Sequence, residues 1–145
     1  MPDTTNQPAT STLATSALRY VFVYGTLRRG EQRDINVLMP APVFIACAQV
    51  AGTLYNLGDY PGLRLGGSQL VWGEVYQIAP ELERQLDEIE EVWPQQTGEY
   101  ARRELRVMVS EVSGSKLEHT CLIYEIAGQR TAGMPVIASG DWLRR

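Results

Sequence analysis

The 145-residue chain contains one histidine, two cysteines and one lysine. His119, Cys47 and Cys121 form no CxxC, HExxH or histidine cluster, so the sequence holds no recognisable zinc site and we expect no metal or other cofactor. A Ser-His-Asp or Cys-His triad would depend on His119, and a Schiff base would depend on Lys116. If the protein is an enzyme, its acid–base group is therefore expected to be a carboxylate.

Positive charge is also scarce, because 13 Lys and Arg residues face 17 Asp and Glu residues and give a formal net charge of -4. Surfaces that bind nucleic acid or anionic membranes need clustered cations, so we expect neither partner. The chain has no apolar run of membrane-span length and no basic, apolar leader at its start. These features favour a cytoplasmic protein with reduced thiols, and the sequence leaves its oligomeric state open.

The chain divides into a tail and one domain. Residues 1–18 are rich in Ser, Thr and Pro and poor in large apolar residues, so we predict a disordered tail. Residues 19–145 are long enough to bury roughly two-thirds of the surface that the unfolded chain exposes, and we predict a single domain there.

Strand patterns outnumber helix patterns in that domain. We expect strands at 20–24, 43–55, 70–78, 100–112 and 117–126, the last two as a hairpin, with a short strand and turn at 135–142. Residues 56–62 are dense in turn formers and predict a loop, and residues 31–39 predict two helical turns. The fold class is therefore α+β, a small mixed β-barrel with flanking helices.

A helix is predicted to begin near Pro80, with Leu82, Leu86 and Ile89 as its apolar stripe. Glu90 is the acid nearest to that stripe. A carboxylate at such a boundary is partly desolvated, which raises its pKa toward the range of a general acid or base. The alternative is that all the acids of this helix are its solvated side, and that reading is preferred for Asp87, Glu88 and Glu91.

The second candidate site is the loop formed by residues 24–30, Tyr-Gly-Thr-Leu-Arg-Arg-Gly, at the end of the first strand. A glycine there lets successive backbone N–H groups form an anion-binding nest, and Arg28 and Arg29 would raise the local potential. The loop lacks the pattern of a nucleotide-binding loop, so a carboxylate is the better ligand. The alternative is a strand end with two solvated arginines.

Other side chains are ambiguous from sequence. Tyr100 and Tyr124 could be site hydroxyls or core residues. Arg102 is expected to pair with Glu104, His119 to be exposed, and both cysteines to be small core residues.

Six segments together resemble the gamma-glutamylcyclotransferase-like family, which includes the AIG2-like proteins. They are VFVYGTLRRG (21–30), GTLYNLGDYPGL (52–63), GEVYQI (73–78), LDEIE (86–90), EYARRELRV (99–107) and SGDWL (139–143). The pattern departs from the family at Glu91, where glycine is usual, and in the segment 33–36.

The resemblance implies a small mixed β-barrel that cleaves a γ-glutamyl amine or γ-glutamyl amino acid by attack of its own α-amine, releasing 5-oxoproline. Glu90 matches the acid that serves as general acid and base. The matches to substrate-binding positions are Tyr24, Gly25, Thr26, Leu27, Tyr100 and Tyr124. The alternative function is a non-catalytic module that binds a small carboxylate metabolite in the same pocket.

Overall fold

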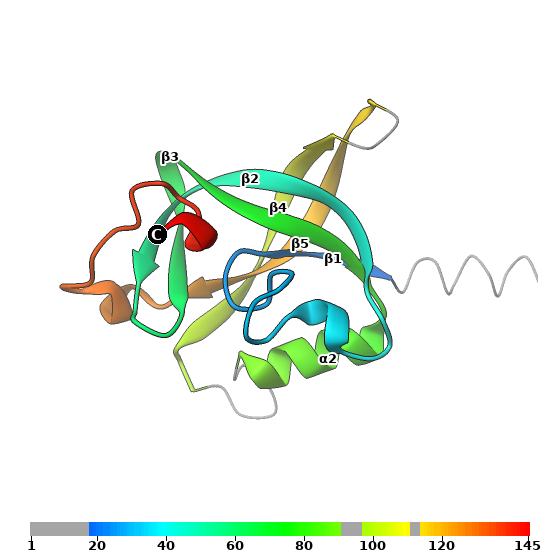
Figure 1. The fold of residues 1–145 in the computed structure, drawn as a ribbon, viewed down its shortest axis with the longest axis horizontal. Helices are drawn as coiled ribbons and strands as arrows, with labels where there is room; N and C mark the ends of the chain where they lie inside the picture. The colour runs from blue at the N-terminus through cyan, green and yellow to red at the C-terminus, as the bar shows by residue number, and fades with distance from the viewer. Residues whose placement is uncertain (1–17, 91–96, 111–113) are drawn as a thin grey trace, which may run out of the picture.

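The computed structural model describes residues 18–90, 97–110 and 114–145 (Figure 1). Residues 1–17 of the predicted tail, Glu91 and residues 111–113 lie outside these ranges. The described elements are β1 (Arg19–Val23), η1 (Ile35–Val37), β2 (Val43–Asn56), β3 (Pro61–Ile78), α2 (Pro80–Ile89), β4 (Tyr100–Ser110), β5 (Lys116–Ile126), η2 (Gly128–Thr131) and η3 (Trp142–Arg144). None of the helices in the described ranges is long and apolar enough to cross a membrane.

The strands form one mixed sheet in the order β2-β3-β1-β5-β4. β1 is parallel to β5, and the other neighbouring pairs are antiparallel. The sheet curls until its edge strands β2 and β4 approach each other, but these two strands are not hydrogen-bonded neighbours. The α+β prediction is thus confirmed, and "barrel" describes a curled sheet that is not closed.

Three predicted segments differ from the structure. The short strand expected at 135–142 does not form, and only an isolated bridge joins Val136 to Tyr55. β3 begins at Pro61, inside the predicted loop, where Gly62 pairs with Tyr55 of β2. Its glycine is needed because a Cβ at Gly62 would lie 2.8 Å from the Ile126 side chain, so it marks a close approach. In the predicted two-turn helix at 31–39 only the short η1 forms, since the Asp34 carboxylate accepts hydrogen bonds from the Gly30 and Asn36 N–H groups and holds a local turn.

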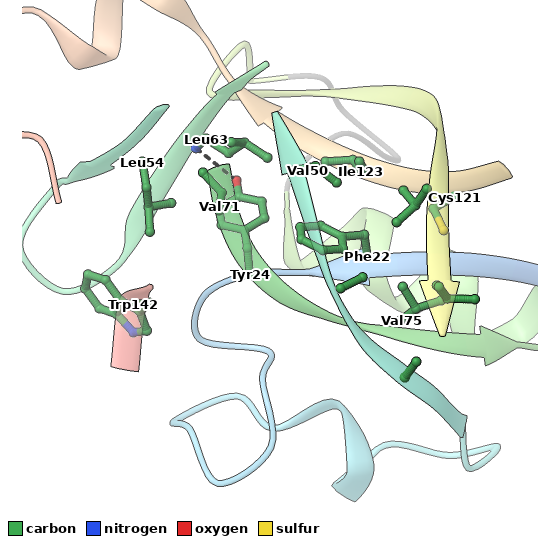
Figure 2. Close-up of a cluster of buried hydrophobic side chains, with 14 of the residues drawn as sticks. Phe22, Tyr24, Val50, Leu54, Leu63, Val71, Val75, Cys121, Ile123 and Trp142 are labelled. Carbon is green, nitrogen blue, oxygen red and sulfur yellow. Dashed lines mark hydrogen bonds between the residues drawn. The ribbon is translucent and has the colours of Figure 1, made fainter. Parts of the chain in front are cut away.

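The interior consists of two hydrophobic clusters on opposite faces of the sheet. Figure 2 shows the first, on the inner face of the curl, which includes Phe22, Val75 and Trp142. The second lies between the sheet and α2, where Leu82 and Leu86 are fully buried. Strand β5, which lies between β1 and β4, contributes to both clusters, with Cys121 and Ile123 to the first and Leu122, Tyr124 and Ile126 to the second.

The two cysteines have different environments. Cys121 is buried as predicted, whereas the prediction for Cys47 is wrong because it is exposed. Ala46 and Ala48 point to the core from β2, so alternation along the strand turns Cys47 outward.

Candidate active site

A cavity of about 510 Å³ lies at the carboxyl end of β1. It is lined by the β1 end, the following loop, the β2–β3 turn, the end of α2 and the strands β4 and β5. The lining residues are Phe22, Val23, Tyr24, Gly25, Thr26, Leu27, Gln32, Arg33, Asp59, Tyr60, Pro61, Ile89, Glu90, Glu99, Tyr100 and Tyr124. The structure therefore brings all seven sequence-predicted site residues to one cavity.

The loop after β1 uses its carbonyl groups to fold on itself. The carbonyl oxygens of Gly25, Thr26 and Leu27 accept hydrogen bonds from the N–H groups of Arg28 (3.0 Å), Arg33 (2.8 Å) and Ile35 (2.9 Å), respectively. Within the described residues, the N–H groups of Gly25–Leu27 themselves donate no hydrogen bond. Three amides at a cavity wall, with their carbonyls engaged elsewhere, can bind a carboxylate or an oxyanion.

Gly25 is required by a close approach. A Cβ at this position would lie 2.5 Å from Pro61 Cγ and 2.8 Å from Pro61 Cδ. Pro61 begins β3 and lines the cavity as well. Glycine thus allows the loop to pack directly against the β2–β3 turn.

Arg28 fits neither of the two readings of this loop, because it is neither a solvated arginine nor an unbalanced charge that raises the potential beside the amides. Arg28 is only 6% exposed, with Nε 3.1 Å from Glu74 Oε2 and Nη1 2.8 Å from Asp141 Oδ1. Its charge is balanced by two buried carboxylates, so it anchors the loop to β3 and to the C-terminal SGDWL segment. Arg29 is exposed, as expected, with its guanidinium 4.7 Å from the centre of the Phe44 ring.

Three tyrosines form the inner wall of the cavity, and each hydroxyl has a fixed acceptor. The Tyr24 hydroxyl donates to the Tyr124 carbonyl oxygen (2.6 Å), and the Tyr100 hydroxyl donates to the Pro61 carbonyl oxygen (2.9 Å). The Tyr124 hydroxyl donates to Asp87 Oδ1 (2.6 Å). Tyr24 also accepts from the Leu63 N–H group at 3.3 Å, the contact drawn in Figure 2.

The tyrosines are neutral at physiological pH. Burial, followed by the negative charge of Glu90, raises the pKa of Tyr24 well above its usual value. Burial is also the main cause of the raised pKa of Tyr100 and of Tyr124, and Glu90 contributes to both. These hydroxyls therefore keep their protons at neutral pH and remain donors to the acceptors named above.

Glu90 is placed at the end of α2, where it is the C-cap residue and lines the cavity beside Ile89. It lines the same cavity as the three wall tyrosines, and its negative charge contributes to the raised pKa of each of them. The helix brings it there because the Leu82–Leu86 stripe is buried against the sheet and fixes the rotation of the helix.

Asp87 corrects a sequence prediction. It was assigned to the solvated side of the helix, but it is only 7% exposed and bonds both the Tyr124 hydroxyl and Arg102 Nη1, the latter at 2.8 Å. Arg102 correspondingly pairs with Asp87 and Glu83, and not with Glu104. A helical wheel cannot reveal this, because the β4–β5 hairpin covers a second side of the helix.

The cavity residues to which the sequence analysis gives no site role include Asp59, Tyr60, Pro61 and Glu99. The Tyr60 hydroxyl donates a short hydrogen bond to Glu99 Oε2, which joins the β2–β3 turn to the start of β4. These residues lie inside two segments that carried the family resemblance, but only tertiary structure brings them together.

His119 lies away from the cavity. It is half-buried, and not exposed as expected, with its ring stacked on Tyr20 at a centroid distance of 4.0 Å. In the described ranges, no group of three or more His, Cys, Asp or Glu side chains is arranged to hold a metal ion.

Comparison with known proteins gives the family. The family model described as "Gamma-glutamyl cyclotransferase, AIG2-like" matches residues 21–144. The chain belongs to this family. The resemblance drawn from the six sequence segments is thereby confirmed.

Two kinds of relative support the assignment. The family includes a gamma-L-glutamyl-butirosin B gamma-glutamyl cyclotransferase from Niallia circulans, which is 38% identical over 102 residues; the match spans 69% of this chain and 64% of that relative. Among solved structures, an AIG2-like protein from Mus musculus has a TM-score of 0.64 at 27% identity, covering 81% of this chain and 84% of the mouse chain. A protein from Pyrococcus horikoshii has a TM-score of 0.59 at 25% identity, covering 86% and 89%.

Proposed function

We propose that this protein is a cyclotransferase that converts a γ-glutamyl amine or γ-glutamyl amino acid into 5-oxoproline and the free amine. The observation that carries the proposal is that the Glu90 carboxylate and the Gly25–Leu27 amides line one cavity. Membership of the gamma-glutamyl cyclotransferase family supports the same chemistry. Tyr24, Tyr100 and Tyr124 would enclose the glutamyl group.

Glu90 acts as general base and then as general acid. It removes a proton from the substrate α-ammonium, whose pKa is roughly 8, and the resulting amine attacks the δ-carbonyl carbon. A C–N bond forms to close the five-membered ring, and the original C–N bond breaks as Glu90 returns the proton to the departing nitrogen. The ring nitrogen still carries two hydrogens after the attack; it gives one to the Glu90 carboxylate, which releases it to solvent, and becomes the lactam N–H. No water is consumed, and the products are one lactam and one amine.

The amides of Gly25, Thr26 and Leu27 supply the electrostatic part of the mechanism. Their N–H groups bind the α-carboxylate or the oxyanion that develops on the δ-carbonyl oxygen. Because their carbonyls are already bonded to Arg28, Arg33 and Ile35, the amides are held in place before the substrate arrives.

The nucleophile belongs to the substrate, so orientation provides much of the rate. Well-oriented intramolecular reactions reach effective molarities on the order of 10⁵ M or more. The wall tyrosines suit this task because each hydroxyl already has its own acceptor and the rings are held in fixed positions.

The test is a product assay with a panel of γ-glutamyl amides. The proposal predicts equimolar 5-oxoproline and free amine, with no glutamate. Release of glutamate in place of 5-oxoproline would mean that water is the nucleophile and would contradict the mechanism. If the panel binds without any turnover, the alternative of a non-catalytic module for a small carboxylate metabolite would replace it.

A further inference from the structure

We propose that the cavity selects γ-glutamyl amides whose departing amine carries a second positive charge, and that Glu99 and Asp59 recognise this charge. The inference rests on the proposed function and specifies its substrate class.

The cavity lining carries more negative charge than a γ-glutamyl group with a neutral or anionic departing group would match. Among the described residues that line it, three are acids, Asp59, Glu90 and Glu99, and one is a cation, Arg33. A γ-glutamyl group has one carboxylate and one ammonium. Glu90 matches that ammonium, and the loop amides with Arg33 match that carboxylate, which leaves Asp59 and Glu99 for the rest of the substrate.

Glu99 is fixed in position toward the cavity. Its Oε2 accepts the hydrogen bond from the Tyr60 hydroxyl, and in the described part of the chain its Oε1 accepts none. Glu90, Glu99 and Tyr100 line the same cavity, and the negative charge of Glu99 contributes, after burial, Tyr24 and Glu90, to the raised pKa of Tyr100. Two carboxylates therefore share this cavity with Tyr100.

Asp59 adds a second carboxylate from the β2–β3 turn. It is exposed at the cavity edge, and among the described residues it makes no hydrogen bond or ion pair. Asp59 precedes Tyr60, the residue that holds Glu99, so the two acids come from segments that are already joined.

Two aromatic rings complete the surroundings of the proposed ammonium. Tyr60 and Tyr100 both line the cavity, with ring centroids 6.4 Å apart. Aromatic faces attract organic cations, and carboxylates beside them add Coulomb attraction. The same carboxylates would repel a departing amino acid, which brings its own carboxylate.

The test uses three substrates with departing groups of similar length and different charge: the γ-glutamyl derivatives of 1,4-diaminobutane (cationic), butylamine (neutral) and 4-aminobutyrate (anionic). For the native protein we expect kcat/KM for 5-oxoproline release to be at least about tenfold higher for the cation than for the neutral compound, and lowest for the anion. Added salt should reduce the difference.

Glu99→Gln keeps an acceptor for the Tyr60 hydroxyl and removes the charge. We expect it to bring kcat/KM for the cationic and neutral substrates to within about twofold of each other, because kcat/KM falls more for the cation than for the neutral compound. Asp59→Asn, at an exposed position, should lower the preference in part and provides the test if Glu99→Gln does not fold. Glu88→Gln, on the exposed side of α2, should leave the preference unchanged.

Failure of this inference and failure of the proposed function give different results. If all three substrates release 5-oxoproline and the cation is no better than the neutral compound, the inference is overturned and the proposed function stands. An equal loss for all three substrates in Glu99→Gln would assign Glu99 a structural role and overturn the inference. No 5-oxoproline from any substrate would overturn both.

Discussion

Gly25 shows how a single residue can control the site. It lies against Pro61 so closely that any side chain must displace one of the two segments, and both segments line the cavity. Since the three loop amides depend on the path of the backbone at this point, the geometry of the site depends on the absence of one methyl group.

We predict that Gly25→Ala lowers kcat/KM for 5-oxoproline release by about 10- to 100-fold, because a displaced amide no longer meets the reacting oxygen. Overpacking at this position should also cost about 1–3 kcal/mol of unfolding free energy. Steady-state kinetics and urea denaturation measure the two effects. Gly128→Ala is the matched control: a Cβ there meets only the Arg64 side chain at 3.7 Å or more, so native values are expected. Unchanged kinetics in Gly25→Ala would remove the loop amides from the mechanism.

The residues that are easiest to place from the sequence are those whose position depends on their neighbours in the chain. The loop after β1 and Glu90 follow from a strand end and from a helix stripe, and both reach the cavity. The sequence does not reveal the burial of Arg28 and Asp87, because their partners, Asp141 and Tyr124, are far away in the chain. A buried charge can be recognised only when its distant counter-group is known.

At the scale of elements, α2 connects the core to the cavity. Leu82 and Leu86 pack it against the sheet, and Asp87, which bonds Arg102 and Tyr124, ties it to β4 and β5. Glu90 follows within one turn of this tie. The position of the proposed general base therefore depends on an interaction between three elements.

We predict that Asp87→Asn lowers the free energy of unfolding by about 2 kcal/mol. The reason is that Arg102 loses its charged partner and the Tyr124 hydroxyl loses a charged hydrogen-bond acceptor. The rate of 5-oxoproline release should fall as well, since Tyr124 and the end of α2 lose their common anchor. Urea denaturation and kcat measure these changes. Glu88→Gln, an exposed acid on the same helix, should change stability by less than about 0.5 kcal/mol. A native-like Asp87→Asn would show that the tie does not hold the helix end.

On the scale of the whole molecule, distant parts of the chain complete the site and the sheet. The C-terminal segment supplies Asp141 to Arg28 and buries Trp142 in the first cluster (Figures 1 and 2). Similarly, Glu125 of β5 accepts hydrogen bonds from the Leu65 N–H group of β3 (2.9 Å) and from Arg103 Nε of β4 (3.0 Å). Glu125 thus joins its own strand, β5, to the neighbouring β4 and to β3, which is not adjacent to β5 in the sheet.

This contact predicts a pH dependence of stability. Burial alone would raise the pKa of Glu125, but the Leu65 N–H group, Arg103 and Arg64 outweigh burial and hold the pKa below the model-compound value of 4.5. Folding therefore favours the ionised form, so the stabilisation is complete above about pH 4.5 and is lost as the pH falls through the folded-state pKa.

We expect Glu125→Gln to lose about 1–2 kcal/mol of unfolding free energy at pH 7, and this deficit to shrink below pH 4.5. Urea denaturation at several pH values between 3 and 7 measures it. Glu118→Gln removes an exposed ion pair with Arg106 on the same hairpin and should show little deficit at any pH. A deficit that is equal at all pH values would show that the charge of Glu125 does not stabilise the fold.

The fold class could be predicted from the sequence because alternation of apolar and polar residues indicates which side of a strand is buried, and turn residues indicate where a strand ends. The β4–β5 hairpin is an example, and its pairing runs from Tyr100 opposite Ile126 to Ser110 opposite Lys116. The sequence could not predict that β3 starts at Pro61, since that start depends on the approach of Ile126. Nor could it show that Tyr60 reaches Glu99, a contact across the mouth of the cavity.

The central claim is that Glu90 transfers the proton in an intramolecular cyclisation. The most direct measurement is kcat for 5-oxoproline release by Glu90→Gln, beside Glu88→Gln and the native protein, on any γ-glutamyl amide that the native protein converts. General acid–base catalysis contributes about 10²- to 10⁴-fold, so we predict a loss of at least about 100-fold in Glu90→Gln and native activity in Glu88→Gln. Equal kcat in all three proteins would contradict the account.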